Sequence, residues 1–255
     1  YSKWRIIPST SNILFKSFDI CYSQNKETTK YLKSLGSKKI KFIGNLKFSE
    51  SKTQKNNNFD SNLKKIFKSK KIWCAASTHD AEEKICVLTH KKLKNKYSNL
   101  LTIIIPRHIQ RTNDIINEIK NLDLKVQTHS TNNKINKNTE IYLVDTYGET
   151  KSFFKICKTV FLGGSLINHG GQNPLEPARF GCKILHGPYI QNFTEIYKLL
   201  NQNNLSSKFN NVNQLVKLVD QSFKQNQNYT NKAIKLKKIG SNILDHTLAD
   251  INYYL

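Results

Sequence analysis

Residues 170–178 combine side chains and backbone features that suit a phosphate and a ribose. They read Gly-Gly-Gln-Asn-Pro-Leu-Glu-Pro-Ala. Asn173 is a preferred helix cap and Pro174 a preferred first-turn residue, so we expect a helix to begin here with unpaired N–H groups that can hold a phosphate. Glu176 lies in the first turn, where its carboxylate can accept hydrogen bonds from both ribose hydroxyls. The segment therefore predicts a site for the phosphate and ribose of a nucleotide, with a structural helix that binds no ligand as the ordinary alternative.

Two further segments carry groups suited to a phosphate. Arg107 follows Pro106 after an apolar run, and it is one of only four Arg among 41 basic residues. Arg makes a forked contact with phosphate that Lys does not. Gly148 and Glu149 open a predicted helix after Tyr147, and the free N–H groups of a helix start attract anions. Each has an ordinary alternative: Arg107 as a solvated residue after a strand, and Glu149 as a carboxylate that complements the helix dipole.

Glycines and histidines beside other predicted strands form a third group. A glycine pair lets the backbone approach a ligand closely, and an imidazole can donate to a phosphate or an oxyanion. A loop histidine is nevertheless more often polar surface, and two glycines alone mean only a tight turn. Glu82 and Glu83 are interpreted as a solvated helix face with one member towards the cleft. The predicted neighbours of the site are Ser77, His79, Gly163, Gly164, Ser165 and His169.

Short apolar, β-branched runs alternate with helical stretches along the chain, a pattern typical of parallel α/β structure. In an open sheet of this kind ligands bind beyond the carboxyl ends of the strands. All the segments described above follow such runs, so we expect them to converge at one edge of a sheet. The predicted strands are residues 19–23, 39–43, 72–76, 100–105, 124–128, 141–144, 159–162 and 183–186.

The same pattern divides the chain. Residues 1–48 read as the last βαβ portion of one domain, and the polar, Asn- and Lys-rich residues 49–62 read as a linker. Residues 63–235 form a complete Rossmann-like domain, and residues 236–255 a C-terminal helix. The chain contains no Met, so we expect a fragment or a processed product.

Composition narrows the class of protein. The chain has 255 residues, 38% of them hydrophobic, and a net charge of +23, which argues against a disordered chain. Its apolar runs are far shorter than the about 18 residues of a spanning helix. The basic residues are almost all Lys, which disfavours sequence-specific nucleic-acid binding. AT-rich codon usage would explain the many Lys residues, and so would attraction to an anionic membrane or substrate. Five scattered Cys without zinc-ligand spacing favour a reducing cytosol.

The motifs together resemble one family. Residues 161–178, with the strings Phe-Leu-Gly-Gly-Ser-Leu and His-Gly-Gly-Gln-Asn-Pro-Leu-Glu-Pro-Ala, closely resemble the 3-deoxy-D-manno-octulosonic acid (Kdo) transferases. The likeness continues at residues 44–48, at 76–79 with Glu82 and Glu83, and at 106–108, 145–149, 187–188 and 192–193. These enzymes add Kdo from CMP-Kdo to the lipid A precursor, lipid IVA, in lipopolysaccharide synthesis of Gram-negative bacteria.

The resemblance implies a GT-B type glycosyltransferase of two Rossmann-like domains, of which this chain holds the CMP-Kdo domain and the end of the acceptor domain. It places CMP on Pro106, Arg107, Tyr147, Gly148 and Glu149 and on residues 173–176. Tyr147 stands where the family's Met is expected. The catalytic base is expected upstream of Tyr1, so the resemblance assigns no catalytic residue here and implies that the isolated chain is inactive.

The implied reaction is inverting and independent of a metal or cofactor, and it takes place at the cytoplasmic face of the bacterial inner membrane. Its partners would be CMP-Kdo, the lipid A precursor and an anionic membrane surface, but no nucleic acid. The absence of an Asp-x-Asp pair is consistent with a metal-independent site. Two alternatives stay open: another GT-B glycosyltransferase or sugar-nucleotide epimerase that uses a uridine nucleotide, and a basic RNA- or membrane-binding module.

Overall fold

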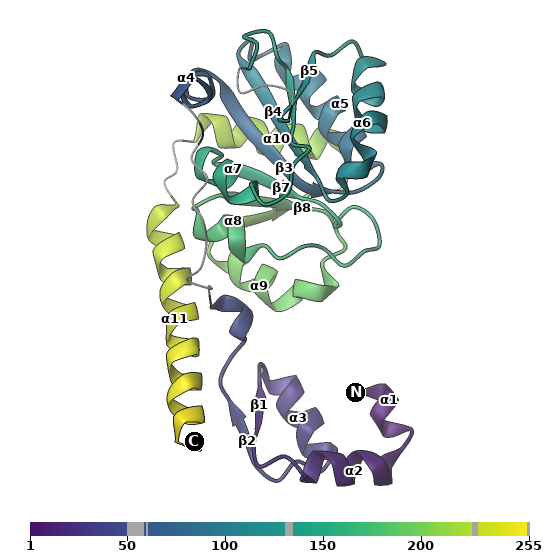
Figure 1. Ribbon diagram of the computed structural model, residues 1–255, viewed down its shortest axis with the longest axis vertical. Helices are drawn as coiled ribbons and strands as arrows, with labels where there is room; N and C mark the ends of the chain where they lie inside the picture. Colours follow the sequence, from purple (N-terminus) through teal and green to yellow (C-terminus); the bar gives the residue numbers. More distant parts are fainter. Residues whose placement is uncertain (50–58, 60, 131–134, 226–228, 254–255) are drawn as a thin grey trace. The chain divides into compact units, whose positions relative to one another are not determined.

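The computed structural model describes residues 1–49, 59, 61–130, 135–225 and 229–253. The chain forms two compact units (Figure 1), one of Tyr1–Gln54 with Ile234–Leu255 and the other of Lys55–Ala233. Most of the predicted linker, residues 50–58 and 60, lies outside the described residues. Within the described part of the chain, no helix is both long enough and apolar enough to cross a membrane.

The first unit contains a small βαβ element, as expected for residues 1–48. Strands β1 and β2 pair in parallel, and Asn25 caps the helix between them by accepting the Thr28 N–H at 2.7 Å. The helices at the N-terminus had no counterpart in the sequence prediction. The elements are α1 (Ser2–Arg5), α2 (Pro8–Lys16), β1 (Cys21–Ser23), α3 (Lys26–Ser34), β2 (Ile40–Phe42) and a 3-10 helix, η1 (Leu46–Phe48).

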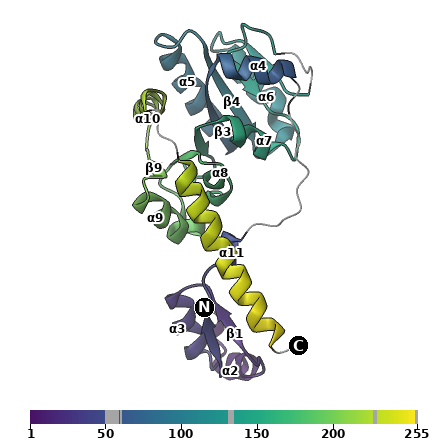
Figure 2. The ribbon, with the colours of Figure 1, turned by 90° about the vertical axis from the view of Figure 1, so that its left-hand side faces the viewer.

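The C-terminal helix α11 (Thr230–Asn252), yellow in Figures 1 and 2, begins at Thr230 rather than at residue 236. From Ile234 onwards it belongs to the first unit. Asp250 accepts a hydrogen bond from the Tyr22 hydroxyl at 2.6 Å and forms an ion pair with Lys41, which ties α11 to β1 and β2. A Cβ at Gly240 would lie 1.8 Å from the carbonyl oxygen of Phe48, so only glycine permits this packing.

The second unit is built on a seven-stranded sheet with the order β5-β6-β4-β3-β7-β8-β9, and every neighbouring pair is parallel. From the central β3 the chain builds one side of the sheet through β4, β5 and β6, then crosses to the other side with β7. The topological switch point therefore lies between β3 and β7, where open sheets bind ligands. The strands are β3 (Lys71–Thr78), β4 (Leu100–Pro106), β5 (Val126–Thr128), β6 (Ile141–Leu143), β7 (Thr159–Leu162), β8 (Lys183–His186) and β9 (Ser206–Lys208).

Helices cover both faces of this sheet. The main core packs α5, α6 and α10 on one face, where Ile141 and Leu143 of β6 point. Tyr142, between them, points to the other face and packs with Phe67 of α4 and Phe153 of α7, and Figure 2 shows α4 and α7 in front of the strands. The helices are α4 (Ser61–Ser69), α5 (Glu82–Lys94), η2 (Ile109–Arg111), α6 (Thr112–Lys120), α7 (Thr150–Ile156), α8 (Leu175–Arg179), η3 (Gln191–Phe193), α9 (Thr194–Gln202) and α10 (Val212–Lys224).

The predicted strands all form. In the second unit, β3, β4, β6, β7 and β8 do so because their apolar runs are buried in a parallel sheet, whereas β1, β2 and β5 are only partly buried. Ile103 and Ile104 of β4, for example, are fully buried. Two elements of this unit were missed. The edge strand β9 reads Ser-Ser-Lys, and the Lys-rich α4 begins at Ser61, inside the predicted linker. The edge strand β9 has no apolar pattern to mark it, whereas Leu63, Ile66 and Phe67 of α4 stand at helical spacing and gave a signal that the prediction overlooked.

Candidate functional site

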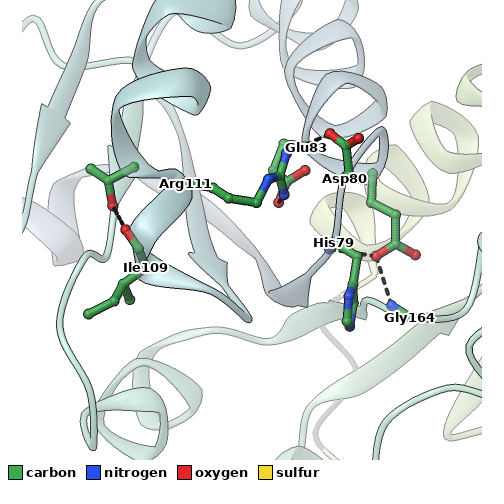
Figure 3. Close-up of polar contacts among 8 residues, drawn as sticks. His79, Asp80, Glu83, Ile109, Arg111 and Gly164 are labelled. Atoms are coloured by element: carbon green, nitrogen blue, oxygen red, sulfur yellow. Dashed lines mark hydrogen bonds and ion pairs between the residues drawn. The ribbon is translucent and has the colours of Figure 1, made fainter.

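The carboxylate of Glu82 organises the switch point (Figure 3). Its Oε2 accepts the backbone N–H groups of His79 at 2.9 Å and Gly164 at 2.7 Å. Its Oε1 accepts those of Ser165 at 3.1 Å and Leu166 at 2.9 Å. One fully buried side chain on α5 thus fixes the loops that follow both β3 and β7.

The glycine at the end of β7 is dictated by the same packing. A Cβ at Gly163 would lie 2.2 Å from the carbonyl oxygen of Ser77 and 2.6 Å from the Cα of Thr78. Both of those atoms are backbone, which has little room to move. Ser77 itself has φ +56° at the irregular end of β3, where the register shifts between Ala76 and Thr78, so the backbone is strained beside Gly163.

The prediction that Glu82 and Glu83 form a solvated helix face is wrong, because both are fully buried. Glu83 pairs with Arg111, whose Nη1 lies 3.1 Å from its Oε1, and the Nη2 of Arg111 lies 2.6 Å from Asp80 (Figure 3). Burial raises the pKa of Glu83, and Arg111 opposes that rise. Helical spacing alone did not reveal that both carboxylates would have internal partners.

Three histidines gather beside Gly164. The ring of His79 lies 4.5 Å from that of His169 and 5.6 Å from that of His108, centroid to centroid. The amide nitrogen of Gln172 lies 3.5 Å from the Nε2 of His79. Burial, and then the positive charges of His169, His108, Arg107 and Arg111, lower the pKa of His79 to about 4. His79 is therefore neutral at pH 7 and has one N–H to donate.

Arg107 and the residues after Leu143 lie at adjacent strand ends. Strands β4 and β6 pair in parallel with Ile104 opposite Leu143, so Arg107 and Tyr147 follow neighbouring strands. The backbone N–H of Arg107 donates to the carbonyl of Thr78 at 2.9 Å, which joins this part of the edge to β3. Pro106 ends the strand as expected, and the Arg107 side chain is exposed.

The turn at residues 147–149 presents the Tyr147 side chain together with the backbone of Gly148 and Glu149. Gly148 has φ +87° with open space around its Cβ position, so conformation and not crowding requires the glycine. The side chain of Tyr147 is 64% exposed. The Glu149 carboxylate accepts a hydrogen bond from Thr146 at 2.6 Å and lies 2.7 Å from Nε2 of His129. These two partners hold the Glu149 side chain, which leaves the backbone of Gly148 and Glu149 to meet a ligand.

Residues 173–176 form a short helical turn. The predicted cap is displaced by one residue: Pro174 is the N-cap, and Asn173, just before it, accepts the Leu175 N–H at 3.1 Å. However, α8 has only five residues and α7 only seven, and the helices begin at Leu175 and Thr150 and not at Asn173 and Gly148. So few aligned peptides make a weak macrodipole. Local N–H groups and side-chain cations must therefore contribute most of the positive potential.

A lysine that was not predicted joins the two turns. Nζ of Lys151, in the first turn of α7, lies 3.3 Å from Oε1 of Glu176. The Glu176 side chain remains 40% exposed, so it can still accept hydrogen bonds from a ligand. One ordinary Lys among many gave no signal in the sequence.

The structure distinguishes ligand-facing from structural residues among those predicted. The Ser165 hydroxyl is fully buried, donates to the Leu162 carbonyl at 2.6 Å and accepts the Gly187 N–H at 2.9 Å. It therefore fixes the loop and has no group free for a ligand. The Leu175 side chain is also fully buried and Pro174 is buried, so both would meet a ligand only through backbone. Within the described residues, no group of three or more His, Cys, Asp or Glu is placed to hold a metal ion.

Comparisons with known proteins place this geometry in context. No family model matches the chain. The chain is 33% identical to the 3-deoxy-D-manno-octulosonic acid transferase of Haemophilus influenzae over 190 residues, which are 73% of the chain and 44% of that protein. It is 28% identical to the enzyme of the same name from Rickettsia felis over 260 residues, covering 100% of the chain and 56% of that protein. The chain thus spans about half the length of these relatives.

Solved structures show the same fold. The C-terminal CMP-Kdo binding domain of WaaA from Acinetobacter baumannii matches with a TM-score of 0.62 and 24% identity, covering 72% of this chain and 93% of that one. Anabaena HepE, in complex with UDP and glucose, matches with a TM-score of 0.55 and 10% identity over 100% of this chain and 67% of that one. The predicted α/β fold of the GT-B type is confirmed. The resemblance in the motifs is confirmed as well: the chain is related over most of its length to the glycosyltransferases known as Kdo transferases.

Proposed function

We propose that the second unit is the donor domain of a Kdo transferase and binds CMP-Kdo at the carboxyl edge of its sheet. One observation carries the proposal: the segments of the resemblance meet at adjacent elements of that edge. Arg107 and residues 147–149 follow the paired strands β4 and β6, and Lys151 links α7 to Glu176 on α8. The names of the relatives supply the sugar, and that of the matching domain supplies the nucleotide.

Each group has a role in this proposal. Glu176, held by Lys151, accepts hydrogen bonds from the ribose hydroxyls. The Arg107 guanidinium and the N–H groups near Gly148 and Asn173 bind the phosphate. In the reaction the acceptor oxygen bonds to the anomeric carbon of Kdo, the bond from that carbon to the phosphate oxygen breaks, and CMP leaves with the electron pair. Fixed N–H dipoles and cations stabilise the charge that grows on the phosphate.

The finer features of the reaction rest on the resemblance. They are transfer to the lipid A precursor, lipid IVA, with inversion and without metal or cofactor, at the cytoplasmic face of the inner membrane. A net charge of +23 favours an anionic lipid surface. The acceptor hydroxyl passes its proton to a base, and the proposal assigns no residue of this chain to that role.

Calorimetric titration of the chain with CMP, UMP and UDP tests the donor assignment. We expect saturable binding that prefers CMP and is lost in Glu176→Ala. The matched control is Glu118→Ala, which removes a carboxylate from α6 and should bind CMP like the wild type. Equal affinity for CMP and the uridine nucleotides, with an intact fold, would contradict the assignment and favour a uridine-dependent enzyme.

A further inference from the structure

Three polar side chains surround the position where Gly164 lacks a Cβ, and a fourth packs against one of them. The atoms nearest to that position are Nδ1 of His169 at 3.2 Å, Nε2 of His79 at 3.3 Å and Nε2 of Gln172 at 3.4 Å. The fourth, His108, packs edge-on against His79. We call His79, His108, His169 and Gln172 the histidine cluster. It lies at the switch point, where His79 and Gly164 are drawn side by side in Figure 3.

The acidic groups near this cluster pair with other residues, although Oε2 of Glu83 is buried without a hydrogen-bond partner in the part of the chain that the structure describes. Glu82 accepts four backbone N–H groups, and Asp80 and Glu83 pair with Arg111. Among the described residues no carboxylate pairs with a member of the cluster, while Arg107 and Arg111 add positive charge. The cluster is thus a group of nitrogen donors in a positive field without an anion of its own.

The cluster also adjoins the proposed phosphate site. The backbone of Arg107 is bonded to the carbonyl of Thr78, the residue before His79, so the phosphate-binding arginine and the buried histidine follow adjacent strands. An octulosonic acid donor carries two anions, the phosphate and the carboxylate of the sugar. In a 2-keto acid sugar the carboxylate is attached to the anomeric carbon that bears the phosphate. A subsite for the carboxylate must therefore lie directly beside the phosphate.

We propose that the histidine cluster binds the carboxylate of the donor sugar, with His169 and Gln172 as its accessible donors and His79 as the buried imidazole that accepts from Gln172 and orients it. The inference rests on the proposed function, since it names a subsite within the same donor site. It assigns the phosphate to Arg107 and local N–H groups, and the sugar's acid group to the cluster. A donor site arranged this way would select acidic sugars over neutral ones, because a neutral sugar leaves these donors without an acceptor.

The experiment compares two ligands and three variants of the full chain. Calorimetry measures the affinities for CMP and for freshly prepared CMP-Kdo. His169→Gln changes an exposed residue and should fold normally, His79→Gln changes the buried imidazole, and His246→Gln on α11 is the matched control. We expect His169→Gln and His79→Gln to weaken CMP-Kdo binding by about tenfold while CMP affinity changes by less than about twofold. His246→Gln should alter neither.

Two calorimetric results would overturn the inference. Equal losses for CMP and CMP-Kdo in the cluster variants would show that the cluster serves the phosphate or the nucleotide. No loss for either ligand in both variants would show a structural cluster. Failure of the wild-type chain to bind CMP would instead refute the proposed function.

A titration without nucleotide tests the carboxylate subsite separately from the proposed binding of CMP. NMR follows the histidine ring protons of the chain during titration with Kdo and with its methyl ester, which lacks the negative charge. A bound carboxylate should shift the signals of His79 and His169 and raise the pKa of His79, while the ester should leave both unchanged. Equal responses to acid and ester, or none to either, would contradict a carboxylate subsite whatever the result with CMP.

Discussion

Replacing Glu82 by Gln should destabilise the second unit far more than a change of one atom suggests. The carboxylate accepts four buried backbone N–H groups, two on each oxygen. Glutamine keeps one oxygen, which can serve two of them, and turns an NH₂ group towards the other two. Each buried N–H without an acceptor costs about 1–3 kcal/mol, so two cost about 2–6 kcal/mol. Loss of this magnitude is a large part of the stability of a typical domain.

Urea unfolding followed by tryptophan fluorescence measures the effect, because Trp73 is fully buried in the core of the second unit. Glu118→Gln makes the same chemical change on α6 and should stay within about 0.5 kcal/mol of the wild type. Backbone NMR adds a local readout, since the amide protons of Gly164, Ser165 and Leu166 should move upfield when the carboxylate is lost. A Glu82→Gln protein with unchanged amide signals and a stability within about 1 kcal/mol of the wild type would refute the reasoning.

Three other perturbations have defined outcomes. Gly163→Ala places a Cβ 2.2 Å from a backbone oxygen and should lower the free energy of unfolding in urea by about 1–3 kcal/mol or more. The loss should exceed that of Gly148→Ala, whose Cβ meets open space. The reverse order would contradict the crowding argument. Lys151→Gln should weaken CMP binding by about two- to fivefold, because Glu176 loses its ion-pair partner. An unchanged CMP affinity measured by calorimetry would show that Glu176 is held in place without Lys151. The pKa of His79 is lowered from 6.5 to about 4, so as the pH falls the unfolded chain binds a proton before the folded chain does. The free energy of unfolding should therefore decrease as pH drops from about 6.5 towards 4. In His79→Gln this free energy should decrease less steeply with pH, and identical slopes in the two proteins would show that His79 is not held neutral.

Much of the architecture was predictable because its signal is local. Buried parallel strands such as β4 need continuous apolar side chains, and glycines mark positive φ, as at Gly148. The order and parallel direction of these elements place their carboxyl ends at one edge, so convergence of the site followed from chain pattern alone. Among the elements that were missed, α1 and β9 are short and α2 has a weak apolar pattern. In contrast, α4 carries Leu63, Ile66 and Phe67 at helical spacing and was predictable.

The sequence by itself determined the fold class, the segments at the carboxyl edge and the family that they resemble. Only the tertiary structure decided what each side chain does there. It buried Glu82 and Glu83, committed Ser165 to the loop, joined Lys151 to Glu176 and placed His79, His169 and Gln172 around Gly164. The physical reason is that a motif records residue types along the chain, whereas hydrogen-bond partners and electric fields come from residues far apart in sequence that folding brings within a few ångströms.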